Sequence, residues 1–108
     1  MLFAALCYDK PGALDLRLAT RAEHLAFLDK YAAQVKLGGP FLDKYAAQVK
    51  LGGPFLDDAD KPVGSLLILD CVDETAARAL LAEDPYAQAG LFERVELRRW
   101  KHVVGAKL

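Results

Sequence analysis

The stretch GSLLILDCVDETAARALLAEDPYAQAG, residues 64–90, predicts a strand, a helix and a turn in direct succession. Its first part, SLLILDCV (65–72), is an apolar run typical of a strand with both faces covered. Asp73 precedes ETAARALLAE and predicts the N-cap of a helix. The segment DPYAQAG (84–90) ends that helix, because Asp, Pro and Gly favour turns. The helical residues expected to face inward are Ala76, Ala79 and Leu80.

Three further strands are expected around this stretch. LFAALCY (2–8) is a second apolar run, again typical of a strand buried on both faces. LGGPFLD (51–57) is a short strand joined through DADKPVG (58–64) to the strand at 65–72, so the two form a hairpin. FERVELRRWKHVV (92–104) is a final strand that alternates between its two faces.

A first helix is expected from about residue 20 to residue 36. Thr20 and Glu23 have the spacing of a capping box, with Thr20 as the N-cap. Lys36 and Gly38 supply a C-terminal charge and a left-handed stop. The expected apolar stripe of this helix consists of Leu25, Leu28, Ala32 and Val35.

A perfect repeat interrupts this pattern, because residues 27–40 recur without change as residues 41–54. Two undiverged copies of this length indicate a duplication inside a finished domain and not a solenoid. The first copy is expected in the helix, because the second would place Gly38, Gly39 and Pro40 in its first turns and lose the capping box. The surplus is expected to form an extra helix at about 41–50, between the first helix and the strand at 51–57.

Without the surplus, the element order is β-α-β-β-α-β, which predicts an α+β, ferredoxin-like fold with an antiparallel sheet. Its helices cover one face of the sheet, yet the strands at 2–8 and 65–72 are apolar on both faces. A second copy of the chain is expected to cover the open sheet face, which gives a homodimer.

The overall composition restricts the kinds of protein that this chain can be. The chain has 108 residues, 54% of them apolar and 27% charged, with a net charge of −1, so a single domain (1–108) with a buried core is expected. No basic block predicts nucleic-acid binding or attachment to an anionic membrane. The N-terminal apolar run is too short for a signal peptide or a membrane span, so a cytoplasmic location is expected. Cys7 and Cys71 have no metal or redox spacing and are expected to be buried thiols without a disulfide between them.

Several segments resemble the YciI-like (YCII-related) family of the dimeric α+β barrel superfamily. They are DKPG (9–12), RLATRAEHL (17–25), GGP (52–54), GSLLI (64–68) and DPYAQAG (84–90). The resemblance implies a dimer whose sheets pack face to face around a cavity. It also implies an active site centred on a histidine and an aspartate, which correspond here to His24 and Asp84. Some related proteins carry out elimination or isomerisation on intermediates of aromatic degradation.

The residue types themselves suggest roles for this site. A neutral His24 near a helix N-terminus could remove a proton, and Asp84, held extended by Pro85, could orient its ring. The candidate substrate-binding residues are Arg17, Arg21, Ser65 and Tyr86. Structural roles are open for the same residues: a turn for Asp84, surface salt bridges for the arginines, and packing for Tyr86 and Trp100. His102 is expected on the surface.

The leading hypothesis is a small-molecule lyase or isomerase that uses His24 and Asp84 for proton transfer in an inter-sheet cavity. It requires no organic cofactor and no metal. The alternative is a non-catalytic dimeric module in which the same cavity binds a small molecule. A third possibility is that the duplication leaves this variant without intact activity.

Overall fold

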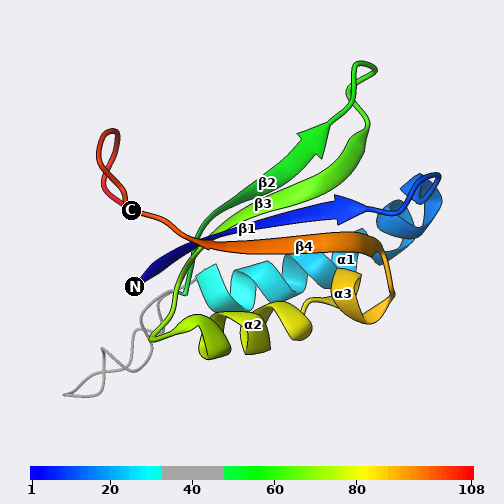
Figure 1. The fold of residues 1–108 in the computed structure, drawn as a ribbon. Helices are drawn as coiled ribbons and strands as arrows, with labels where there is room; N and C mark the ends of the chain where they lie inside the picture. The colour runs from blue at the N-terminus through cyan, green and yellow to red at the C-terminus, as the bar shows by residue number, and fades with distance from the viewer. Residues whose placement is uncertain (33–47) are drawn as a thin grey trace.

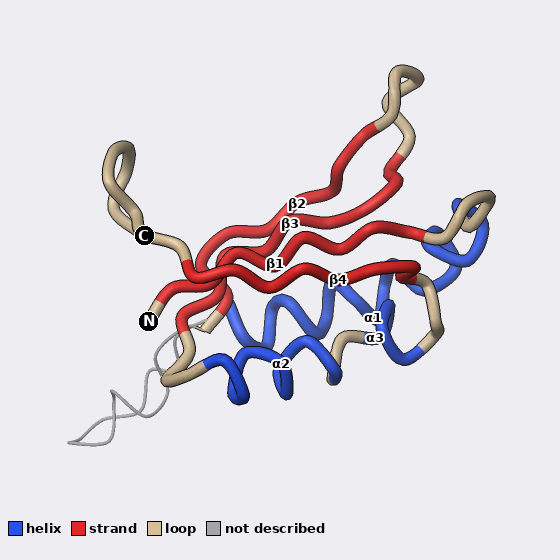
Figure 2. Tube along the Cα trace, viewed as in Figure 1, coloured by secondary structure: helices blue, strands red, loops and turns tan. Residues whose placement is uncertain are grey.

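The computed structural model describes residues 1–32 and 48–108. Its elements are β1 (Leu2–Asp9), α1 (Leu14–Ala32), β2 (Val49–Leu56), β3 (Pro62–Asp70), α2 (Glu74–Ala82), α3 (Pro85–Gln88) and β4 (Phe92–Arg99). The strands of this part of the chain form one antiparallel sheet in the order β2-β3-β1-β4. All of the described helices lie on the same face of the sheet (Figures 1 and 2). The expected α+β, ferredoxin-like fold is confirmed.

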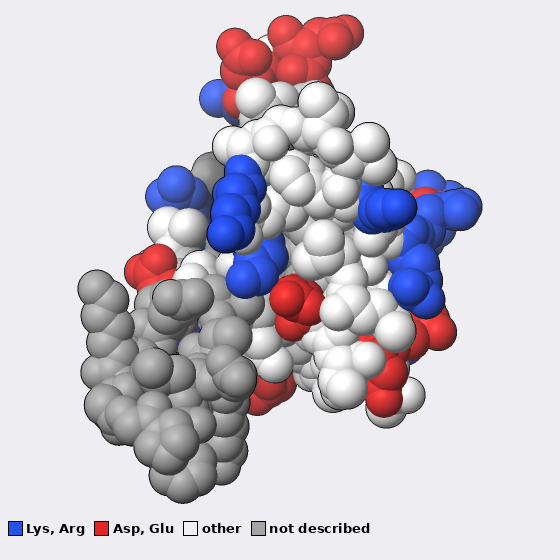
Figure 3. All heavy atoms as spheres, turned by 90° about the vertical axis from the view of Figure 1, so that its left-hand side faces the viewer, with Lys and Arg blue, Asp and Glu red and all other residues white. Residues whose placement is uncertain are grey.

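The central strand β1 shows how the core is arranged. Phe3, Ala5 and Cys7 are buried on the face that carries the helices, whereas the residues between them are only half-buried. Within one chain β1 is therefore buried on one face only, because the helices cover a single face of the sheet, and cover for its other face stays a prediction. Figure 3 views the molecule from the side at the left of Figure 1. Uncharged side chains lie there among Lys and Arg side chains and an acidic side chain near the middle, and further acidic side chains lie at the β2–β3 turn.

Helix α1 begins at Leu14, well before the expected start at Thr20. Thr20 is buried inside the helix, so the capping-box interpretation is wrong. The residues before Thr20 include good helix formers such as Leu, Arg and Ala. The nearest break in the chain is the Pro11–Gly12 turn, where Gly12 has a φ of 68°. The helix is described up to Ala32, so the expected end at residue 36 lies outside the described residues.

The buried face of α1 also differs from the expected apolar stripe. The buried residues are Arg17, Thr20, His24 and Phe27. Leu25 is 40% exposed, Leu28 is only partly buried and Ala32 is exposed, while Val35 lies outside the described residues. The apolar pattern did not identify this face because three of its four buried residues, Arg17, Thr20 and His24, are polar. Arg17 and His24 are satisfied by partners elsewhere in the chain.

The strand lengths follow from the length of β1. Leu2 pairs with Asp70 of β3, and the N–H of Trp100 donates to the carbonyl of Leu2 at the end of β4. Beyond Leu2 the pairing with β3 continues only through the N–H of Cys71, which donates to the carbonyl of Met1 at 3.0 Å. Strand β3 therefore stops at Asp70 instead of residue 72, and β4 stops at Arg99 instead of residue 104.

Helix α2 begins as expected. Asp73 is its N-cap, and the Asp73 carboxylate accepts a hydrogen bond from the N–H of Ala76 at 2.8 Å. Ala77, Leu80 and Leu81 are buried, whereas Ala79 is exposed, which corrects the expected inward position of Ala79.

The two copies of the repeated unit occupy different elements. Residues 27–32 of the first copy complete α1, and residues 49–54 of the second copy begin β2. The expected extra helix at 41–50 is wrong for Val49 and Lys50, which are in β2, and its remainder falls at or before Gln48, mostly outside the described residues. The N–H of Gln48 donates to the carbonyl of Tyr31 at 2.9 Å, so the chain returns to the end of α1 after residues 32–47.

Both cysteines are free and buried, as expected. Cys7 faces Ser65 across the β1–β3 pair, and Cys71 follows the opposite end of β3. Among residues 1–32 and 48–108, no helix is long and apolar enough to cross a membrane.

We predict that deletion of residues 34–47 leaves the fold intact and raises the free energy of unfolding by roughly 1–2 kcal/mol. The deletion leaves one copy of the unit and turns the existing contact between Gln48 and Tyr31 into a tight i to i+3 turn. The stabilisation comes from the shorter loop that must be closed on folding. Urea unfolding of both proteins measures it, and a shortened chain that is less stable or fails to fold contradicts the prediction.

Candidate active site

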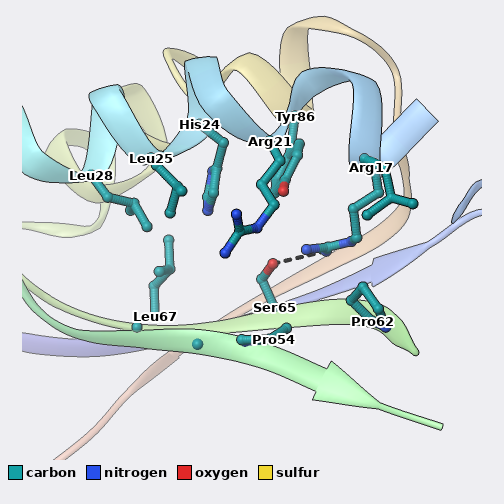
Figure 4. A pocket seen from close by; sticks show the side chains of 13 residues that line it. Arg17, Arg21, His24, Leu25, Leu28, Pro54, Pro62, Ser65, Leu67 and Tyr86 are labelled. Carbon is teal, nitrogen blue, oxygen red and sulfur yellow. Dashed lines mark hydrogen bonds between the residues drawn. The ribbon is translucent and has the colours of Figure 1, made fainter. Parts of the chain in front are cut away.

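A cavity of about 210 Å³ lies between α1 and the inner face of β2 and β3 (Figure 4). Its polar lining residues are Arg17, Arg21 and His24 of α1, Ser65 of β3 and Tyr86 of α3. Leucines of α1 and residues 52–54 of β2 complete the wall. The cavity thus lies between a helix and the sheet of one chain, which corrects the expected inter-sheet position. The reason is that His24 belongs to the buried face of α1, and α1 packs on a single face of the sheet.

His24 and Asp84 meet at the inner wall of this cavity. Nδ1 of His24 lies 2.8 Å from Oδ1 of Asp84, and the two residues are only 6% and 1% exposed. An ionised carboxylate can only accept, so Nδ1 carries the shared proton and Nε2 of the neutral ring keeps its lone pair. Nε2 of His24 has no hydrogen-bond partner among the described residues. None of their side-chain nitrogen or oxygen atoms is both buried and without a partner, so Nε2 is accessible from the cavity that His24 lines.

Local chain chemistry positions Asp84. Its backbone is extended, with φ −61° and ψ 125°, as Pro85 was expected to impose. The Asp84 carboxylate is also the N-cap of α3, because Oδ1 accepts a hydrogen bond from the N–H of Tyr86 at 2.9 Å. One carboxylate oxygen therefore receives both the backbone and the imidazole proton. His24 itself lies in the third turn of α1, so the expected effect of a helix N-terminus on its ring does not apply.

Tyr86 is stacked between His24 and Arg17. Its ring centre lies 3.9 Å from that of His24, with 17° between the planes, and the Arg17 guanidinium carbon lies 4.5 Å from the same centre. At these spacings one face of the ring has room for only one group, so the two partners occupy opposite faces. Burial raises the pKa of the Tyr86 hydroxyl and the Asp84 charge adds to this, while Arg17 opposes it, so the phenol stays protonated at neutral pH.

Arg17 is held by an acidic partner. Nε and Nη2 of Arg17 donate to the two carboxylate oxygens of Asp9 at 2.6 and 2.9 Å, and Nη2 also donates to Oγ of Ser65 at 2.9 Å. The Arg17 and Asp9 side chains are 4% and 6% exposed. Burial alone lowers the pKa of Arg17, but the hydrogen bond and charge of Asp9 outweigh it and raise that pKa above its ordinary value.

Arg21 differs from Arg17 in its surroundings. It is exposed, lines the cavity, and makes no ion pair or hydrogen bond with another side chain of residues 1–32 or 48–108. Figure 4 shows its guanidinium between α1 and the sheet, with His24 on one side and Ser65 and Arg17 on the other. The structure thus brings five of the six predicted site residues to the wall of one cavity and places the sixth, Asp84, directly behind His24.

Asp9 was missed as a site residue by the sequence analysis. The available signal was an acid directly after the first apolar strand, in the DKPG segment, followed along the chain by Arg17. The β1–β4 register shifts at Asp9, and such bulges can redirect a side chain. Cys7 lies near this group, but burial raises its pKa to about 12, with Asp84 and Asp9 adding to the effect and Arg17 opposing it, so it stays a thiol.

His102 and Trp100 lie outside the cavity, in the chain that follows β4. Their rings are 5.8 Å apart, and Trp100 is 38% exposed. Within the described part of the chain, no group of three or more His, Cys, Asp or Glu side chains is arranged to hold a metal ion.

Comparison with protein families matches residues 1–101 to the YCII-related domain. Protein YciI of Escherichia coli O6:H1 is 30% identical over 110 residues, which cover 95% of this chain and 99% of that protein. An uncharacterized protein of Haemophilus influenzae has the same identity over the same length and coverage.

Solved structures give a consistent result. The 5-chloro-2-hydroxyhydroquinone dehydrochlorinase TftG of Burkholderia phenoliruptrix AC1100, in complex with 2,5-dihydroxybenzoquinone, is 30% identical with a TM-score of 0.76. The similarity covers 95% of this chain and 96% of TftG. SnoaB of Streptomyces nogalater, a cofactor-independent oxygenase, has a TM-score of 0.55 at 16% identity and covers 97% of both chains, which supports the fold alone.

Replacing Asp9 with Asn should lower the free energy of unfolding by about 3–5 kcal/mol, because it leaves the buried Arg17 guanidinium without its counter-charge. The matched control is Glu74→Gln in the Arg78–Glu74 pair, whose side chains are 57% and 60% exposed. That variant should lose about 0.5 kcal/mol or less. Chemical denaturation of the three proteins measures both values, and equal small losses would argue against a structural ion pair.

Proposed function

Because the chain belongs to the YCII-related family, we propose that it is a cofactor-independent lyase or isomerase that transfers a proton on a small ring substrate. His24 is the general base, and Asp84 orients it. The observation that carries the proposal is the buried 2.8 Å contact between Nδ1 of His24 and Asp84, which leaves Nε2 open to the cavity. TftG, at 30% identity, is a dehydrochlorinase of a hydroxylated ring, which supports a reaction of the elimination class.

In the proposed step, Nε2 of His24 accepts a proton from a hydroxyl group or carbon of the bound ring. The imidazolium that forms is stabilised by the Asp84 carboxylate at Nδ1. The stacked Tyr86 ring keeps the imidazole plane fixed and offers its π face to the new positive charge. No other side chain of the protein needs to gain or lose a proton in this step.

The electron balance needs no external oxidant or reductant. When a hydroxyl proton leaves a keto tautomer of the ring, the O–H electron pair forms a C=O bond. The displaced pair departs with an anionic leaving group at a conjugated carbon, and the sum is loss of H–X. In an isomerisation, the imidazolium instead returns the same proton to a different carbon of the ring.

Ser65 and Tyr86 are proposed to orient the substrate. Oγ of Ser65 accepts from Arg17, so its own proton is available to a substrate oxygen in the cavity. Tyr86 stays protonated and can donate in the same way. Arg17, neutralised by Asp9, is proposed to hold these two groups in place.

The test is elimination of chloride from 5-chloro-2-hydroxyhydroquinone under anaerobic conditions, followed by chloride release and by absorbance. His24→Gln should lower kcat/KM by about 10²–10⁴-fold because the base is lost. Asp84→Asn should lower kcat/KM by at least about tenfold, since an amide cannot stabilise the imidazolium. His102→Gln is the matched control and should stay within about twofold of the wild type, because His102 lies outside the cavity.

A second readout needs no substrate. The imidazole nitrogen chemical shifts of His24 should change in Asp84→Asn, because Nδ1 loses its charged hydrogen-bond acceptor. Ligand binding without turnover in the wild type would favour the non-catalytic binding module. Turnover that survives in His24→Gln would contradict the assigned base.

We extend the proposal to a homodimer formed through the open face of the sheet. Leu51 and Leu66 of β2 and β3 are 52% and 36% exposed, and they border a shallow apolar depression with Phe55 and Ile68. Apolar surface of this kind is commonly covered by a partner.

Light scattering coupled to gel filtration should therefore give a dimer for the wild type at micromolar concentration. Leu66→Asp should weaken association by at least about tenfold, because it places a charge in an apolar interface. Val103→Asp is the control, since Val103 is 82% exposed in the chain after β4. A monomeric wild type, or a Leu66→Asp variant that dimerises normally, would refute the proposed interface.

A further inference from the structure

The charged side chains that line the cavity are all cationic. Arg17 and Arg21 belong to its wall, and no described Asp or Glu does, because Asp9 and Asp84 lie behind the residues that they bind. A cavity whose lining carries one sign of charge favours a ligand of the opposite sign. The remaining lining residues are largely apolar, so the negative charge of the ligand is expected only at the part of the molecule beside the arginines.

Only one of the two arginines is available to such a ligand. Arg17 uses Nε and Nη2 on Asp9 and Ser65, its guanidinium packs on Tyr86, and its charge is matched by Asp9 at 2.6 Å. Arg21 has no ion pair within residues 1–32 and 48–108, and its guanidinium projects into the space beside His24 (Figure 4). The positive charge that remains unmatched in the cavity is that of Arg21.

Size restricts the ligand further. The cavity of about 210 Å³ is moderately larger than the roughly 150 Å³ of a protein cavity that holds one benzene molecule. A single six-membered ring with a few substituents fits this volume, and a fused two-ring system would have to extend through the open side of the cavity. Leu25, Leu28 and Leu67 line the cavity and supply apolar contact for the faces of such a ring.

We propose that the cavity selects a single-ring phenolate, whose ionised oxygen pairs with Arg21 while the ring lies beside Nε2 of His24. This inference rests on the proposed function and adds the charge and size of its substrate. Arg21 is then the group that recognises the ionised ring oxygen, and Arg17 is a positioning residue. Arg21→Lys keeps the positive charge of the side chain and Arg21→Gln removes it, so the two variants separate the effect of charge on binding from the effect of packing.

The probes are para-nitrophenolate and its neutral methyl ether, para-nitroanisole, both measured by calorimetry at a pH above the pKa of the phenol. The wild type should bind the phenolate at least about tenfold more tightly than the ether. Arg21→Gln should weaken phenolate binding by about 10- to 100-fold and leave binding of the ether unchanged. Arg21→Lys should retain most of the preference. Arg78→Gln, on the exposed face of α2, should bind both probes as the wild type does.

The fused-ring anion 4-nitro-1-naphtholate should bind the wild type at least about tenfold more weakly than para-nitrophenolate. Equal binding of phenolate and ether by the wild type, no loss of phenolate binding in Arg21→Gln, or tight binding of the naphtholate would each overturn the proposal. These measurements involve no turnover. Selective phenolate binding alongside a failed elimination assay would therefore sustain this inference and reject only the proposed reaction.

Discussion

The ion pair between Arg17 and Asp9 is the contact that allows α1 to pack where it does. A guanidinium buried against a sheet is strongly destabilising unless its charge and its N–H groups are matched. Asp9 supplies two hydrogen bonds from the end of β1, and Ser65 supplies a third from β3. This three-way contact fixes the rotation of α1 about its axis. Thr20, His24 and Phe27, at helical spacing from Arg17, must then face the sheet as well.

The turn between α2 and α3 positions the acidic partner of His24. Asp84 caps the short helix α3 and accepts the imidazole proton through the same oxygen. Tyr86, two residues later, inserts its ring between His24 and Arg17. The position of the imidazole is therefore set from two directions, by the ion pair at the start of α1 and by the cap that follows α2. Both supports are buried, which limits the alternative positions of the ring.

The two copies of the duplicated unit contribute different parts of their sequence to the fold. Residues 27–32 of the first copy are helical, and residues 49–54 of the second copy, which correspond to positions 35–40 of the first, form a strand. The first copy continues a helix that has already begun at Leu14, and the second lies beside β3 and pairs with it. The hydrogen bond between Tyr31 and Gln48 joins the two elements.

The sequence by itself determined the element order, the helix cap at Asp73 and the extended backbone at Asp84. These features depend on neighbours within a few residues or on runs of apolar side chains, both of which can be read along the chain. The site residues were found through the family motifs; five of them supply the polar lining of the cavity, and Asp84 lies behind His24. Only the tertiary structure decided where α1 begins, which face it buries, and which arginine remains available. The physical reason is that Arg17 and His24 are polar and become buried only because Asp9, Ser65 and Asp84, distant in the chain, meet them in the folded protein.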